Sequence, residues 1–134
     1  MRVYVGPVNQ ASAKAECTAM NSAAVPSGFE NKAEIATMMA IANAIQANTV
    51  LIIGEKRTQA CQNSVLTATC TKTNSFYWTD GHTDGIEGWS WGGGNPDNGY
   101  DLTQWNVVVN SATDLMDDVA DATKGGVVCG MLAT

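Results

Sequence analysis

Residues 74–123 read NSFYWTDGHTDGIEGWSWGGGNPDNGYDLTQWNVVVNSATDLMDDVADAT, and this stretch says most about fold and function. It contains no lysine or arginine. Its carboxylates are Asp80, Asp84, Glu87, Asp97, Asp101, Asp114, Asp117, Asp118 and Asp121. Acidic side chains crowded without basic partners either face water separately or converge on a cation. Ca²⁺ takes about six to eight oxygen ligands from carboxylates, amide side chains and backbone carbonyls. Asn95-Pro96-Asp97 and Asp117-Asp118 are the sharpest candidates for such a site.

The composition describes a globular chain with an acidic surface. Its 134 residues are 45% hydrophobic and 15% charged, which fits one domain, residues 1–134, with a sizeable core. The net charge of −6 at pH 7 argues against nucleic acid and anionic membrane surfaces as partners, because both attract basic faces. No apolar stretch is long enough for a membrane span, and the first residues lack the apolar core of a signal peptide. We expect either a cytosolic protein or a mature secreted domain.

Four cysteines bear on that choice: Cys17, Cys61, Cys70 and Cys129. Their spacings do not match a zinc site, and they allow more than one disulfide connectivity. Cys61 and Cys70 bracket a short polar loop where a local bridge is natural, and Cys17 would then pair with Cys129. The alternative is four free buried thiols in a cytosolic protein. We favour two disulfides in a secreted protein, because free cysteines usually lie in apolar runs and Cys61 and Cys70 do not.

Local patterns predict helices early in the chain and strands later. Residues 9–20 are rich in alanine, and residues 32–46, capped by Asn31, carry apolar side chains at helical spacing. Those expected to form the buried face of the second helix are Ile35, Met38, Met39, Ile41, Ala42 and Ile45. Residues 49–54 form a β-branched run typical of a buried strand. Further short strands are expected at residues 2–5, 75–79, 105–109, 114–119 and 126–132. The fold class is therefore α+β.

Residues 79–103 contain almost no aliphatic side chain. A loop of this length without regular structure is uncommon and usually functional. Tryptophans and a bound cation are the means available to hold its backbone. We therefore expect Trp78, Trp89 and Trp91 to anchor the core and the loop and not to act as ligand platforms.

Several motifs, taken in order, resemble a C-type lectin-like domain, and the resemblance covers nearly the whole chain. The matching segments are Cys17 in the first helix, Phe29-Glu30-Asn31, Ile52-Ile53-Gly54, Phe76-Tyr77-Trp78-Thr79-Asp80-Gly81, Trp91-Gly92-Gly93-Gly94-Asn95-Pro96-Asp97, Met116-Asp117-Asp118 and Gly126-Val127-Val128-Cys129-Gly130. The loop from Cys61 to Cys70 looks like the nematode branch of the family. The resemblance implies two helices, a small antiparallel sheet and a long loop region that carries Ca²⁺. It also implies a Cys17–Cys129 disulfide and a cis peptide bond before Pro96.

In this family one Ca²⁺ pins the loops and also coordinates two vicinal hydroxyls of a sugar. The implied metal ligands here are Asn95, Asp97, Gln104, Asp117 and Asp118. The implied sugar contacts are Asn95, Asp97 and Asp117, with the ring of Tyr100, or less favourably Trp105, packed on the sugar. Amide first and carboxylate second, as in Asn95-Pro96-Asp97, implies galactose-type ligands, with mannose-type ligands as the other possibility.

Two departures from the family pattern affect the site. Gln104 is neutral where the family has an acid, and Asp101 could substitute for it. Asn106 and Asp121 lie near the positions of a second cysteine pair, so no covalent link ties the long loop to the sheet. We therefore expect Ca²⁺ to order the loop and chelation to loosen it.

Plainer interpretations exist for the other polar residues. Asp117-Asp118 could be an ordinary solvent-facing turn, since Asp is common in turns. Asp80 and Asp84 could form an acid/base pair for glycoside hydrolysis, but both lie in Asp-Gly turns, where Asp is favoured for backbone reasons. His82 is expected to be an exposed turn residue, and Lys56-Arg57 is expected to be solvated.

The sequence thus predicts a secreted, Ca²⁺-dependent carbohydrate-binding domain and not an enzyme. Its partners would be glycans of cell surfaces or microbes. Single lectin sites bind weakly, so assembly into a homo-oligomer would add avidity. The alternative is a metal-independent lectin-like domain that binds a protein partner.

Overall fold

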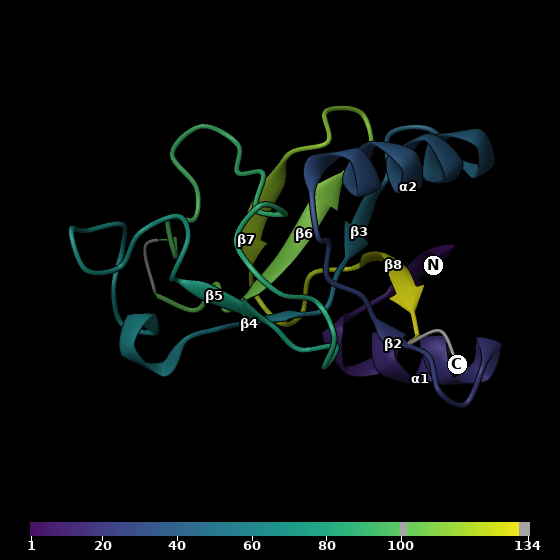
Figure 1. Ribbon diagram of the computed structural model, residues 1–134, viewed down its shortest axis with the longest axis horizontal. Coiled ribbons are helices and arrows are strands. Elements are labelled where there is room, and N and C mark those ends of the chain that lie inside the picture. The colour runs from purple at the N-terminus through teal and green to yellow at the C-terminus, as the bar shows by residue number, and fades with distance from the viewer. Residues whose placement is uncertain (100–101, 132–134) are drawn as a thin grey trace.

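The computed structural model describes residues 1–99 and 102–131 (Figure 1). Over these residues the elements, in chain order, are β1 (Arg2–Val8), α1 (Gln10–Met20), β2 (Val25–Pro26), α2 (Lys32–Ile45), β3 (Val50–Ile52), β4 (Glu55–Arg57), a short 3-10 helix (Gln59–Cys61), β5 (Phe76–Trp78), β6 (Asn106–Asn110), β7 (Met116–Val119) and β8 (Gly125–Gly130). The main sheet has the order β1-β8-β3-β6-β7, with β2 also paired to β8, and β4 and β5 form a separate ribbon. Figure 1 shows both helices on the right and the segments between β4 and β6 extending to the left.

The helices begin where the polar caps predict. Asn9 Oδ1 accepts from the Ser12 N–H at 3.0 Å, and Ser12 Oγ accepts from the Asn9 N–H at 3.0 Å, so both groups at the start of α1 are satisfied. Asn31 Oδ1 accepts from the Glu34 N–H at the start of α2. The expected buried face of α2 is partly wrong: Ile41 is 44% exposed and Ile45 is 59% exposed, because the far side of α2 faces water.

Both faces of the main sheet are buried. Leu51 and Val107 pack in one apolar cluster with Met39 of α2, while Ile52 and Val108 pack in a second cluster with residues of α1. Successive strand residues point to opposite faces, so β3 and β6 contribute to both clusters in turn. In Figure 1 the sheet accordingly lies between α2 and α1. No helix in the described part of the chain has the length and apolar character to cross a membrane.

Two disulfides close the fold, and both expected pairings are confirmed. Cys17 of α1 is bonded to Cys129 of β8, and Cys61 is bonded to Cys70 across the polar loop. The first bridge therefore ties a helix near the start of the chain to the last strand. Closing so long a loop is the case in which a disulfide restricts the unfolded chain most.

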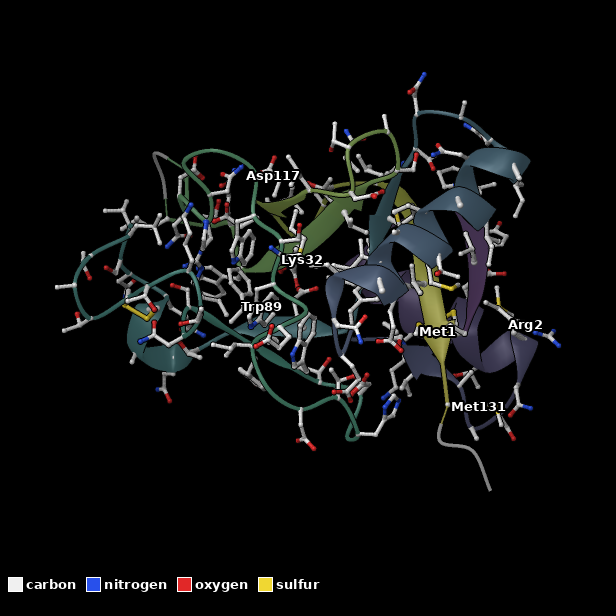
Figure 2. The ribbon with its side chains drawn as sticks, turned by 45° about the horizontal axis from the view of Figure 1, so that its top comes forward. Met1, Arg2, Lys32, Trp89, Asp117 and Met131 are labelled. Atoms are coloured by element: carbon white, nitrogen blue, oxygen red, sulfur yellow. A yellow bond between two sulfur atoms is a disulfide. The ribbon has the colours of Figure 1, made fainter. Side chains whose placement is uncertain are left out.

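Three tryptophans form a stack that supports the loop region. The rings of Trp78 and Trp89 are parallel within 6°, with centroids 3.8 Å apart. The Trp91 ring also stacks on Trp89, with centroids 5.6 Å apart. Trp78 Nε1 donates to the carbonyl of Gly85, and Trp91 Nε1 donates to that of Lys72. Trp89 is buried at the centre of this stack (Figure 2). The expectation that these rings are anchors is confirmed.

Sequence patterns missed β4, which contains a buried acid. Glu55 is 1% exposed, and its Oε1 accepts the Val107 N–H of β6 at 2.8 Å. Its Oε2 has no hydrogen-bond partner among the described residues. Burial raises the pKa of Glu55 well above its ordinary value, against opposing effects of the Val107 N–H and of Lys56. The carboxyl group therefore resists ionisation in the folded protein.

Replacing Glu55 with glutamine is expected to stabilise the fold, and to do so more at pH 8 than at pH 5. Glutamine keeps an acceptor for the Val107 N–H but cannot ionise. The folded pKa of Glu55 is raised, so at a pH above the ordinary pKa of glutamic acid the unfolded state binds fewer protons than the folded state. The stability of the wild-type protein therefore falls as the pH rises through this range. We expect the gain to grow from near zero at pH 5 to on the order of 1 kcal/mol or more at pH 8, because each tenfold difference in proton affinity between the folded and unfolded states corresponds to about 1.4 kcal/mol. Urea denaturation of both proteins at both pH values measures the difference, and a gain independent of pH would contradict this account.

Candidate functional site

The expected site residues come from the loop before β6 and from β7. The Met116 N–H donates to the carbonyl of Ser90 at 2.7 Å, and the Gly92 N–H donates to that of Met116 at 3.0 Å. These bonds place Asn95-Pro96-Asp97 beside Asp117-Asp118. The peptide bond between Asn95 and Pro96 is cis, as the resemblance implied.

Asp118 lies beneath this surface, fully buried, and accepts three donors. Its Oδ1 accepts the N–H of Asp97 at 3.0 Å, and its Oδ2 accepts the N–H of Asn98 at 2.6 Å. The third donor is Nη2 of Arg57, 2.5 Å from Oδ2. Burial raises the pKa of Asp118, and the two N–H groups and Arg57 oppose that rise. The carboxylate therefore already has a cation, which the protein itself supplies.

Arg57 is the residue that the sequence analysis placed wrongly. It was expected to be solvated with Lys56, yet Arg57 is 2% exposed while Lys56 is exposed. The reason is the strand period: β4 points Glu55 and Arg57 inward and Lys56 outward. The Arg57 guanidinium lies 4.5 Å from the centroid of the Phe76 ring, and its Nε donates to the carbonyl of Gln104. The available signal was weak: a stretch of acids without basic partners later in the chain requires a cation from elsewhere, but the sequence does not say which one.

Asn98 is a second residue that sequence reasoning missed. It is buried, and its Nδ2 donates to the carbonyls of Gln62 at 2.8 Å and Ser64 at 3.0 Å. Its Oδ1 accepts the N–H of Gln104 at 3.0 Å. Asn98 thus links the site loop to the loop closed by Cys61 and Cys70. Asn98 adopts a positive φ of 59°, which asparagine tolerates better than most residues.

Three of the expected ligands remain open at the surface. Asp97 and Asp117 are exposed and Asn95 is half-buried. Asp97 Oδ1 accepts the Gly99 N–H at 3.1 Å, while the side chains of Asn95 and Asp117 make no hydrogen bond to the described residues. Partial burial raises the pKa of Asp117, and Asp118 and Asp97 raise it further by repulsion. Figure 2 shows Asp117 on the outside of the loop region.

The residues fit a cation only in part. Asp97, Asp117 and Asp118 repel one another, and within the described residues only Asp118 of the three pairs with Arg57, so these four side chains carry a formal charge of −2 (−3 + 1) that a divalent cation would neutralise. Asn95, Asp97 and Asp117 offer the oxygen donors that Ca²⁺ prefers. Asp118 is committed to Arg57, and the Gln104 side chain lies against Gly99 with its Oε1 buried and unpaired within the described chain. No group of three or more His, Cys, Asp or Glu within residues 1–99 and 102–131 is arranged to hold a metal.

Of the two rings expected on the sugar, Tyr100 lies outside the described residues, as does the alternative ligand Asp101. Trp105 is half-buried, and its Nε1 donates to the carbonyls of Leu102 at 2.9 Å and Gln62 at 3.2 Å. Trp105 therefore anchors the end of the loop.

Of the alternative acid/base pair, Asp80 and Asp84, the side chain of Asp80 is occupied by hydrogen bonds to backbone N–H groups. Asp80 Oδ1 accepts the N–H groups of His82 and Thr83, and Oδ2 accepts the Gly28 N–H at 2.7 Å and the Thr83 hydroxyl at 2.5 Å. The net pKa of Asp80 is lowered: burial acts to raise it, but these hydrogen bonds to the ionised form outweigh burial. His82 is partly buried, with Nε2 3.5 Å from Asp80 Oδ2. Asp80 holds a turn and is not available to donate a proton.

The positions of the missing cysteine pair are joined by another bond. Nδ2 of Asn106 donates to Oδ1 of Asp121. The segment that follows β7 is therefore held to the start of β6 without a disulfide.

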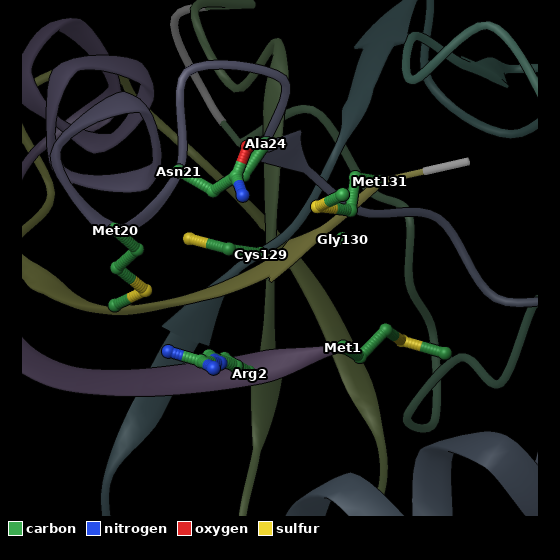
Figure 3. A pocket seen from close by; sticks show the side chains of 8 residues that line it. All are labelled: Met1, Arg2, Met20, Asn21, Ala24, Cys129, Gly130 and Met131. Atoms are coloured by element: carbon green, nitrogen blue, oxygen red, sulfur yellow. The ribbon is translucent and has the colours of Figure 1, made fainter. Parts of the chain in front are cut away.

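A separate pocket lies far from this surface, at the ends of β1 and β8 (Figure 3). It has a volume of about 190 Å³ and is lined by Arg2, Met1, Met20 and Cys129 among others. The thioethers of Met1 and Met20 point in different directions in Figure 3. The pocket offers no carboxylate to a sugar hydroxyl or a hard cation.

No protein-family model matches the sequence, and no curated protein matches it either. Solved structures match over most of their length. The C-type lectin CEL-I from Cucumaria echinata superposes with a TM-score of 0.74 at 19% identity, covering 96% of this chain and 86% of that one. The C-type carbohydrate-recognition domain of cow CD23, determined in the presence of the oligosaccharide GlcNAc2Man3, gives a TM-score of 0.74 at 16% identity, covering 99% and 87%. A calcium-independent type II antifreeze protein gives a TM-score of 0.64 at 17% identity, covering 95% of this chain and 82% of that one.

These similarities bear on architecture. Two helices and small sheets in this order and arrangement are the C-type lectin-like fold, which this chain adopts. The fold expected from the motifs is confirmed. At identities below 20%, the similarities do not transfer a ligand.

Proposed function

We propose that residues 1–134 form one extracellular carbohydrate-recognition domain that binds glycans of cell surfaces or microbes. The observation that carries this proposal is the open polar edge formed by Asn95 and Asp97 of the loop and Asp117 of β7, with the loop hydrogen-bonded to the buried Asp118. Two disulfides support an extracellular location, because such bonds persist in oxidising compartments.

The edge has the chemistry that sugar hydroxyls need. A hydroxyl donates one hydrogen bond and accepts others, so it can donate to a carboxylate while it accepts from an amide N–H. Asp97 and Asp117 supply carboxylates, and Asn95 supplies an amide with both donor and acceptor. Their order along Asn95-Pro96-Asp97 favours galactose-type ligands over mannose-type ones. Tyr100 is proposed to pack on the apolar face of the sugar.

Calcium would be held at this edge by Asn95, Asp97 and Asp117, with Asp118 and Gln104 contributing less than the sequence suggested. When bound, it would offer direct coordination to two sugar hydroxyls. The three side chains would orient the hydroxyls, and the net charge of −2 in the cluster would attract the cation. Assembly into a homo-oligomer would add the avidity that single weak sites lack.

A glycan array probed in Ca²⁺ and again in EDTA tests the proposal. We expect binding to galactose-type glycans in Ca²⁺ that is lost in EDTA. Asp97→Asn and Asp117→Asn should each lower binding at least about tenfold, the effect of losing one charge-assisted hydrogen bond of roughly 1.5 kcal/mol. The matched control is Asp84→Asn, which removes an exposed carboxylate elsewhere and should bind like wild type. Binding unaffected by either site variant would refute the assignment of this edge.

A second candidate function is metal-independent binding of a protein partner. The observation that favours it is the Arg57–Asp118 pair, which holds the loop in place without a metal. Absence of glycan binding in both buffers, together with a folded protein, would support this alternative over the first.

A further inference from the structure

We infer that Arg57, and not Ca²⁺ as the sequence led us to expect, performs the loop-ordering role of a cation, so that Ca²⁺ serves ligand binding here and is not needed to fold the loop. The statement about ligand binding rests on the proposed function. The statement about loop order rests on the contacts of Arg57 alone.

The position of Arg57 is built by two small elements. It pairs with Phe76 in the β4–β5 ribbon, and its guanidinium packs over the Phe76 ring. From there it reaches Asp118 on β7, a strand of the other sheet. The side chain therefore crosses from the ribbon to the main sheet beneath the site loop.

Arg57 holds both ends of that loop. At the start, Asp118, which Arg57 contacts, accepts the N–H groups of Asp97 and Asn98. At the end, Nε of Arg57 donates to the Gln104 carbonyl at 3.0 Å, and the Arg57 backbone N–H donates to the Trp105 carbonyl at 3.2 Å. One residue, with three separate donors, thus holds residues 97–98 through Asp118 and residues 104–105 directly.

A guanidinium differs from a metal ion in two respects that matter here. It is part of the chain, so dilution or a chelator cannot remove it. Its planar set of N–H donors also serves a carboxylate and a carbonyl at fixed angles, which an ammonium group on lysine cannot reproduce. Asp97 and Asp117 lie outside the ion pair and remain exposed, so an exchangeable cation can come and go at the edge while Asp118 stays paired. Ligand release by loss of calcium would then leave the domain folded.

Hydrogen exchange of wild-type protein in excess Ca²⁺ and in EDTA tests this inference. We expect the amide hydrogens of Asp97 and Asn98 to stay protected from exchange in EDTA as they are in Ca²⁺, while the melting temperature rises in excess Ca²⁺ only by what binding to the folded state contributes. Loss of protection at these two amides in EDTA would overturn the inference, because calcium would then order the loop. The outcome is independent of glycan binding: protection kept without any glycan binding would refute the proposed function and leave the role of Arg57 intact.

Variants sharpen the test. Arg57→Lys keeps the positive charge but cannot bond to the Asp118 carboxylate and the Gln104 carbonyl at the same time, as the guanidinium does. It should therefore expose the amides of Asp97 and Asn98 to exchange in both buffers. The matched control is Lys56→Met, which changes the exposed neighbour on the same strand and should leave protection as in wild type. If Arg57→Lys keeps full protection, the geometry of the guanidinium is not what orders the loop. The wild-type comparison still decides the question if the variant fails to fold.

Discussion

Replacing Arg57 with methionine is expected to lower the free energy of unfolding by about 3–5 kcal/mol, the range seen when one partner of a buried ion pair is removed. The change leaves Asp118 buried with its charge uncompensated, and the loop loses its donor to the Gln104 carbonyl. Asp118→Asn should have a comparable effect, because it leaves the guanidinium unpaired. Urea denaturation in a calcium-free buffer measures both.

The double variant Arg57→Met/Asp118→Asn distinguishes an ion pair from general loss of packing. With both charges gone, neither residue is left as an unpaired buried charge, and the single oxygen of asparagine can still accept one of the two loop N–H groups. The double variant should therefore lose much less than the sum of the single losses. Additive losses would mean that the two residues act independently and that the pair is not the link between ribbon and sheet.

Much of the fold could be predicted because its signals are local. Asn9 and Asn31 cap helices within a few residues of themselves, and both helices begin where these caps place them. The polar loop between Cys61 and Cys70 pointed to the local disulfide, which then determined the other. Ile41 and Ile45 were misplaced because an apolar helix does not reveal how much of its circumference the sheet covers.

The site was harder to predict because its decisive contact is not local. Glu55-Lys56-Arg57 carries three charges in a row, which is ordinarily a solvated segment. The two buried side chains depend on partners far along the chain: Glu55 on the Val107 N–H, and Arg57 on Asp118. Nothing within a window around residue 57 indicates either partner. The acids of this region stand out in the sequence, but the cation that pairs with Asp118 is an arginine that the sequence places forty residues earlier than Asp97 (97 − 57).

Replacing Trp89 with alanine is expected to have an effect as large as that of Arg57→Met, about 3–5 kcal/mol, typical of removing a large aromatic side chain from a core. Trp89 is 7% exposed and lies between Trp78 and Trp91, with Phe76 against the same cluster. Alanine would leave a cavity that the two outer indoles, each held by a hydrogen bond through Nε1, cannot easily fill. Thermal denaturation measures the loss. Tyr77→Ala is the matched control, since Tyr77 lies on β5 next to Trp78 and is 50% exposed. It should change stability by less than about 1 kcal/mol.

The same variant also tests whether the stack supports the binding edge. Trp89 precedes Ser90, whose carbonyl accepts the Met116 N–H and so places the loop beside β7. If the stack positions this loop, Trp89→Ala should weaken glycan binding even at temperatures where the protein is still folded. Trp89→Phe refills part of the cavity, so it should recover most of the stability and binding. Full binding by folded Trp89→Ala would show that Arg57 and Asp118 suffice to position the edge, and that the tryptophans serve stability alone.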